Sequence, residues 1–342
     1  MDVFEELKRI IAPFSIEQID NALSDRPSSF DVDARWYSNH DGPPRTTSDR
    51  SPFNGDALLA GMQAVCLLGT YLPVGDPRRL GVPKLHAKIL ARLANPELLL
   101  FGGSRAPKIE GKPYVAPGYQ SNPSHHGVDN GAIIVAHGYL YFRPGRIPAT
   151  DTDNLAHVRD AAELHYPQST FPWSGLYHTW QAALSPGVAA LVARAADSPL
   201  PAGSSELDPR LSAPDLVDAA AARLKLDRDA ATLYLQILAL VDCGDAPIRE
   251  LNGWTQTKHK KAAAALVSAG LVVEQKHPRA NRKFVLDSPW EQLFPPHPAV
   301  ERAKLPLYDA RIEGPALAAP LGRVLPLRPL PEIFAAAWQR IS

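Results

Sequence analysis

The chain has 342 residues, of which 45% are hydrophobic and 21% charged, and its 36 basic side chains balance 36 acidic ones. This composition excludes an intrinsically disordered chain, and the length allows two domains, or one large domain with an appendage. A chain of this size buries a sizeable core without disulfides or bound metals.

The longest apolar stretch, residues 57–72, is interrupted by Gln63 and Thr70 and is followed by a proline. It is too short and too mixed to span a bilayer, so we expect a buried helix and no membrane association. No charged-then-apolar leader opens the chain, which indicates a cytoplasmic protein. Cys66 and Cys243 lie in apolar helical segments and are expected to be reduced core thiols, although one disulfide between them stays open.

The first 200 residues mix helical and strand patterns. Apolar residues at helical spacing predict helices at 2–11, 15–23, 55–72, 83–93, 153–165 and 187–195. Short apolar runs predict strands at 98–101, 131–136 and 139–143, the last two joined by a His137-Gly138 turn. Stretches rich in proline and without a period predict loops near 25–55 and 104–130. We therefore expect residues 1–197 to form an α+β domain with a small sheet, whose role the sequence does not reveal.

Histidines and aspartates gather in residues 125–165 and raise the alternative of a metal-dependent hydrolase. The residues concerned are His125, His126, Asp129, His137, Asp151, Asp153, His157 and His165. A shared ion usually requires a short spacing, such as two histidines at i and i+4 on one helix, and this spacing is absent. Phosphate-binding loops, nucleophile elbows and reactive-cysteine contexts are absent as well. We expect no metal, no cofactor and no catalytic residue, and the hydrolase stays an alternative.

Residues 198–213 are rich in proline, glycine and serine, which is typical of a linker, so we place a domain boundary there. A second domain then covers residues 214–290. Residues 291–342 form a proline-rich tail that ends in a short amphipathic helix at 332–341. Such a tail packs over its own domain or docks a partner.

The second domain has a recognisable order of elements. Helical patterns cover residues 212–224, 230–241, 247–252 and 255–269, followed by strand patterns at 271–276 and 282–286. A short helix, a turn containing Gly253 and a longer helix make a helix-turn-helix, and a β-hairpin directly after it makes a wing. Over about a quarter of the chain the order resembles the winged helix-turn-helix superfamily of bacterial transcription regulators. The resemblance implies DNA binding associated with transcription, and it leaves a homodimer open.

Positive charge gathers in the last helix and the hairpin of this domain. Between residues 255 and 286, seven basic residues accompany one acidic residue, which gives +6, so the remainder of this neutral chain carries −6. Lysines near a helix N-terminus oppose the helix dipole by about 0.3–1 kcal/mol each, a cost that a docked polyanion would reverse. We predict contacts with duplex DNA from Gln256, Thr257, Lys258, Lys260, Lys261, Lys276, Arg279, Arg282 and Lys283.

A helical projection of residues 256–269 separates two faces. The side expected to be buried consists of Ala262, Ala265, Leu266 and Ala269, and the opposite side of Thr257, Lys260 and Ala264. The main alternative is a non-catalytic adaptor or scaffold that uses the winged helix for protein contacts, because lysines are common on any exposed helix face.

Overall fold

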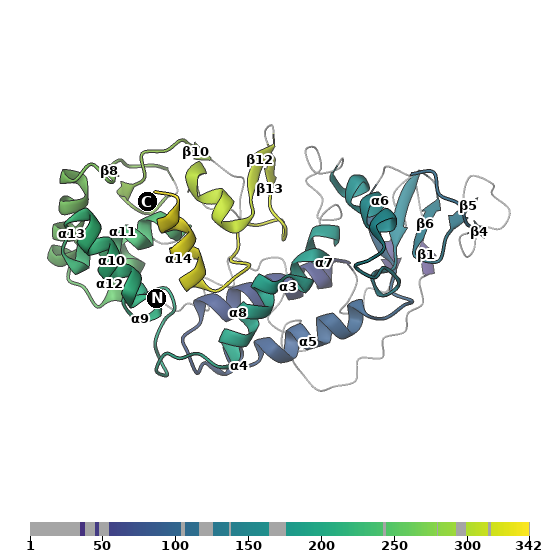
Figure 1. Cartoon of the computed structure of the whole chain (residues 1–342), viewed down its shortest axis with the longest axis horizontal. Coiled ribbons are helices and arrows are strands. Elements are labelled where there is room, and N and C mark those ends of the chain that lie inside the picture. Colours follow the sequence, from purple (N-terminus) through teal and green to yellow (C-terminus); the bar gives the residue numbers. More distant parts are fainter. Residues whose placement is uncertain are drawn as a thin grey trace.

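The computed structural model describes residues 35–37, 45–47, 55–103, 107–115, 126–136, 138–163, 176–241, 244–278, 280–291, 299–313 and 316–341. The helices predicted at 2–11 and 15–23, and Cys243, lie outside these residues. The described chain is a mixed α and β structure with small antiparallel sheets. It is elongated, with an N-terminal lobe (residues 55–196) and a C-terminal lobe (residues 207–341) along its long axis (Figure 1).

A five-stranded antiparallel sheet stands at the outer end of the N-terminal lobe, with its strands in the order β3-β7-β6-β5-β4. The strands are β3 (Leu100–Gly103), β4 (Lys112–Val115), β5 (His126–Asp129), β6 (Ile133–Ala136) and β7 (Tyr139–Phe142). The predicted hairpin is confirmed, since Ala136 pairs with Tyr139 across a two-residue turn. β4 and β5 arise within the stretch predicted as a loop. Their four-residue segments carry no alternating apolar pattern, because neither strand is buried.

Helices form the rest of the N-terminal lobe. They are α3 (Gly55–Tyr71), α4 (Pro77–Leu80), α5 (Val82–Leu93), α6 (Thr152–Glu163), α7 (Leu176–Leu184) and α8 (Pro186–Ala196). α6 and α7 lie against the sheet, whereas α3, α5 and α8 pack on one another toward the C-terminal lobe (Figure 1). Cys66 is a free thiol buried in α3, and its burial raises its pKa to about 12. A small two-stranded hairpin pairs β1 (Arg35–Tyr37) with β2 (Arg45–Thr47).

The C-terminal lobe is built around α11, whose residues 230–239 are all buried. Its helices are α9 (Pro209–Ser212), α10 (Pro214–Leu224), α11 (Arg228–Ala239), α12 (Asp245–Asn252), α13 (Gln256–Ser268) and α14 (Leu330–Gln339). α9, α10, α13 and α14 all pack on α11. The segment predicted as a linker, residues 198–213, contains α9 and the buried carboxylates of Glu206 and Asp208. It is therefore part of the packed structure.

The C-terminal segment contains more regular structure than the single short helix predicted for the proline-rich tail. It contains β10 (Trp290–Glu291), β11 (Val300–Glu301), the 3-10 helix η4 (Arg302–Tyr308), β12 (Arg311–Glu313) and β13 (Ala316–Ala318) before α14. Leu321, Leu325 and Leu327 join the core of the N-terminal lobe, whereas α14 buries Ile333 and Phe334 in the core of the C-terminal lobe. The apolar face of α14 is therefore occupied within the chain, so it is not free to dock a partner. None of the helices in the described ranges has the length and apolar character that a membrane crossing requires.

Candidate nucleic-acid interface

α12, α13 and a short hairpin follow one another at the outer end of the C-terminal lobe (Figure 1). Gly253 ends α12 in the left-handed conformation, with φ of 64°, so the chain turns at once into α13. The hydroxyl of Thr255 caps α13 by accepting the Lys258 amide at 3.2 Å. The hairpin pairs β8 (Val273–Glu274) with β9 (Phe284–Val285). These bounds agree with the predicted helices and turn, although the strands are shorter than predicted.

The buried side of α13 is rotated slightly from the projected one. His259, Ala262, Ala263 and Leu266 are buried, whereas Ala269 is exposed although it was projected inward. The polar face is as projected: Thr257, Lys260 and Ala264 are all exposed. Ser268 is also exposed and continues the polar face toward the helix C-terminus. Its helical spacing from Thr257 could have predicted this position from the sequence.

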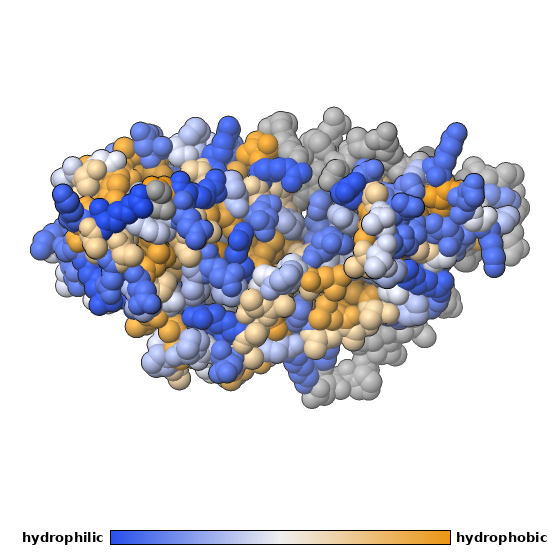
Figure 2. Space-filling model, in the orientation of Figure 1, coloured by the Kyte–Doolittle hydropathy of each residue, from blue (hydrophilic) through white to orange (hydrophobic). Residues whose placement is uncertain are grey.

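Four lysines of α13 and the hairpin are exposed, and no carboxylate of the described residues pairs with them. These four residues, called the lysine face below, are Lys260, Lys261, Lys276 and Lys283. Figure 2 shows hydrophilic residues mixed with less polar ones at the end of the lobe where α13 lies in Figure 1. The neighbouring acid, Glu274, is exposed on β8. The four side chains of the lysine face are thus each exposed to solvent.

Lys258 differs from the lysine face because it has partners inside the lobe. Its ammonium lies 3.0 Å from the carboxylate of Asp229 and 5.4 Å from the centre of the Trp254 ring. Both groups remain well exposed, so the ion pair is weak and screened. Lys258 is therefore partly neutralised. Gln256 is exposed beside it in the first turn of α13.

Arg282 does not belong to the exposed cationic surface, in contrast to the prediction. Its side chain is 3% exposed and forms an ion pair with Glu301, whose carboxylate is completely buried. It also donates to the Val241 carbonyl at 2.9 Å. The sequence concealed this role because both partners are distant along the chain. Arg279 lies outside the described residues.

His259 occupies the inner face of α13, where its ring packs near Phe284 of β9. Burial lowers its pKa, an effect that the carboxylate of Asp245 partly opposes from 3.9 Å. Asp245 also accepts the Lys283 backbone N–H at 3.1 Å. The imidazole therefore lies between the helix, the hairpin and the start of α12 as a neutral core group.

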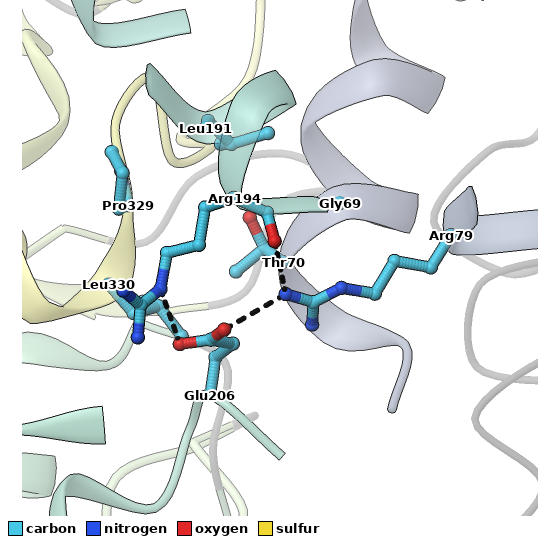
Figure 3. A pocket seen from close by; sticks show the side chains of 8 residues that line it. All are labelled: Gly69, Thr70, Arg79, Leu191, Arg194, Glu206, Pro329 and Leu330. Atoms are coloured by element: carbon cyan, nitrogen blue, oxygen red, sulfur yellow. Dashed lines mark hydrogen bonds and ion pairs between the residues drawn. The ribbon is translucent and has the colours of Figure 1, made fainter. Parts of the chain in front are cut away.

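A small pocket at the junction of the lobes is filled by ion pairs rather than shaped for a ligand (Figure 3). The Glu206 carboxylate accepts from Arg79 and from Arg194, each at 2.9 Å. Arg79 donates in addition to the Leu72 carbonyl at 2.9 Å. Arg79 and Glu206 are almost wholly buried, so their charges hold the segment after α8 against the N-terminal lobe.

The described residues also give the hydrolase alternative no metal site. Among them, no three histidine, cysteine, aspartate or glutamate side chains come together. His125, His137 and His165 lie outside the described residues, and His126 is exposed on β5. Asp129 instead pairs with Arg143 at 2.8 Å.

Comparison with known proteins adds no relative: no family model matches the chain, and no curated protein or solved structure is significantly similar to it.

Proposed function

We propose that residues 214–290 act as a winged helix-turn-helix module that binds duplex DNA. α13 would enter the major groove as the recognition helix, and the β8–β9 hairpin would lie as a wing over the adjacent backbone. The order of α11, α12, α13 and the hairpin supports this reading, as does the tight turn at Gly253. A transcription-associated role follows only by association with this fold class.

The lysine face is the observation that carries the proposal. Lys260 and Lys261 lie in the second turn of α13, which begins at Gln256, and both side chains are exposed. The helix dipole acts mainly on charges in the first turn, so it contributes little at these two positions. A phosphate backbone docked at this end would compensate both charges and release counterions.

Base contacts would come from the two polar side chains that precede the lysines of α13. Gln256 and Thr257 are exposed in the first turn of α13. A glutamine amide can pair with adenine in the major groove, and a threonine hydroxyl can bond several base edges. Lys276 and Lys283 would contact phosphates, which positions the protein without specifying a sequence.

The position of α13 leaves room for a duplex. It lies at the opposite end of the long axis from the five-stranded sheet of the N-terminal lobe (Figure 1). The carboxylates of that lobe therefore lie away from the lysine face and do not neutralise it.

The experiment is a fluorescence-anisotropy titration of the full chain with a mixed-sequence duplex of about 25 base pairs, at about 50 and 200 mM salt. Binding should weaken steeply with salt. Lys260→Ala with Lys261→Ala should lower the affinity about tenfold and reduce the slope of log K against log salt by about two.

The matched control removes two exposed lysines from the other end of the molecule, through Lys108→Ala with Lys112→Ala. This control should leave both affinity and slope unchanged. Absence of salt-dependent binding, or equal losses in the two double variants, would overturn the proposal. Unchanged duplex binding in the α13 variant would favour a protein-contact role for the module.

A further inference from the structure

The hairpin proposed as the wing is too small to hold its own position. β8 and β9 have two residues each, and among the described residues they pair only with one another. An isolated two-stranded hairpin is marginally stable in water, and longer ones than this fray. Something outside the hairpin must therefore set its orientation against α13.

A buried ionic cluster at the foot of the hairpin supplies such a support. The Glu301 carboxylate receives Arg282, which directly precedes Lys283, and also Lys304, whose ammonium lies 3.1 Å away. Burial alone would raise the pKa of Glu301, but Lys304 and Arg282 outweigh that effect and hold the pKa below its usual value. The carboxylate therefore stays ionised between two cations.

The same cluster binds the end of α11. Arg282 donates to the Val241 carbonyl at 2.9 Å, and Lys304 donates to the Leu240 carbonyl at 2.8 Å. The Tyr308 hydroxyl donates to the Ala239 carbonyl at 2.7 Å. Three successive carbonyls are thereby satisfied, the last of α11 and the two that follow it, and two of the donors bring positive charge close to this helix end, which favours it.

A second contact, between two rings, supports the connection between β8 and β9. The Trp290 ring stacks on His277 with centroids 4.2 Å apart and planes 8° apart. The Arg282 guanidinium lies 5.3 Å from the centre of the same ring. Trp290 also pairs with Glu301 between β10 and β11, so the ring and the carboxylate belong to one unit.

We infer that these residues form a brace that positions the wing, a role that a third strand would otherwise play. The brace consists of Arg282, Trp290, Glu301, Lys304 and Tyr308. It orients Lys276 and Lys283 relative to α13, so the C-terminal segment contributes to DNA binding by supporting the wing. This inference rests on the proposed function. Trp290 and Glu301 are positioning residues: they would affect DNA binding by holding Lys276 and Lys283 in place.

The first test measures the wing without DNA, by amide hydrogen exchange on the full chain. Trp290→Ala should accelerate exchange across residues 273–285, whereas the amides of α13 should keep their protection. Trp290→Phe retains an aromatic ring for His277 and Arg282 and should restore slow exchange. Unchanged exchange in Trp290→Ala, or equal acceleration in α13, would overturn the brace even if the chain binds no duplex.

The second test is a double-mutant cycle on binding to the same duplex of about 25 base pairs. Trp290→Ala should weaken binding about fivefold in the native background and have no further effect when Lys276→Ala and Lys283→Ala are present. Trp290→Phe should bind like the native chain. Equal losses in both backgrounds would overturn the positioning role. Failure of the native chain to bind duplex would instead overturn the proposed function.

Discussion

Two arginines of the N-terminal lobe and two exposed lysines of α13 in the C-terminal lobe use positive charge in different ways. In the N-terminal lobe, Arg79 and Arg143 are held by carboxylates and by backbone carbonyls. At the outer end, Lys260 and Lys261 are exposed, and no described carboxylate pairs with them. A guanidinium holds a carboxylate through two parallel hydrogen bonds, whereas an ammonium is a flexible, strongly hydrated charge. The arginines thus serve the structure, and the lysines are left for solvent or a polyanion.

The two lobes also share one closing element. The C-terminal segment places Leu321 and Leu327 in the N-terminal core before α14 enters the C-terminal core. Gln63 of α3 donates to the Leu321 carbonyl at 2.9 Å, which ties the segment to the N-terminal lobe. The lobes therefore differ at their surfaces but depend on the same stretch of chain for their interiors.

The largest expected effect concerns this shared element. Phe334→Ala removes a wholly buried ring from α14 and should lower the free energy of unfolding by about 3–5 kcal/mol. Denaturant unfolding of the full chain measures it. Ile341→Ala, at a side chain that is 45% exposed just beyond the helix, should change stability by less than about 0.5 kcal/mol. Similar values for the two variants would show that α14 does not close the core.

The next effect tests the ion pairs at the junction of the lobes. Glu206→Ala leaves the buried Arg79 guanidinium without its carboxylate and should cost about 3 kcal/mol. Glu97→Ala breaks the exposed pair with Arg146 and should cost under about 1 kcal/mol. Thermal unfolding distinguishes the two variants. A small loss for Glu206→Ala would contradict a structural role for the junction charges.

A smaller effect sharpens the contrast between paired and unpaired cations. Asp229→Asn frees Lys258 and should raise the affinity for duplex about two- to threefold at low salt. Asp218→Asn removes an equal charge from the exposed pair with Arg228 and is the matched control. Anisotropy titrations compare the two variants. An equal gain in both would indicate a general charge effect rather than release of Lys258.

The smallest expected effect is a pH dependence of the free energy of unfolding, caused by His259 on the inner face of α13. Burial lowers the pKa of His259 in the folded chain, so below its ordinary value of 6.5 the unfolded chain binds the proton more readily. The stability that the neutral imidazole contributes is present at neutral pH and is lost as the pH falls. Urea unfolding between about pH 7.5 and 5.5 should show the decline, and His259→Gln should flatten it. A native chain that gains stability toward acidic pH would contradict this sign.

Helix boundaries in the C-terminal lobe follow from the sequence because their signals are local. Thr255 and Gly270 delimit α13, and the apolar spacing within residues 230–241 predicts the buried helix α11. The exposure of Lys260 follows from the same helical period. β4 and β5 escaped prediction because neither strand is buried, so neither needs apolar alternation, and their pairing depends on segments elsewhere in the chain.

By itself, the sequence determined where α13 begins and ends, and it concentrated positive charge between residues 255 and 286. Only the tertiary structure decided which charges of the hairpin are exposed. Arg282 and Lys283 are neighbours, yet one is buried against Glu301 and the other faces solvent. The difference arises because Arg282 has a buried partner, Glu301, that lies 19 residues further along the chain. Local backbone preferences act over a few residues, whereas burial and ion pairing arise only when distant segments meet.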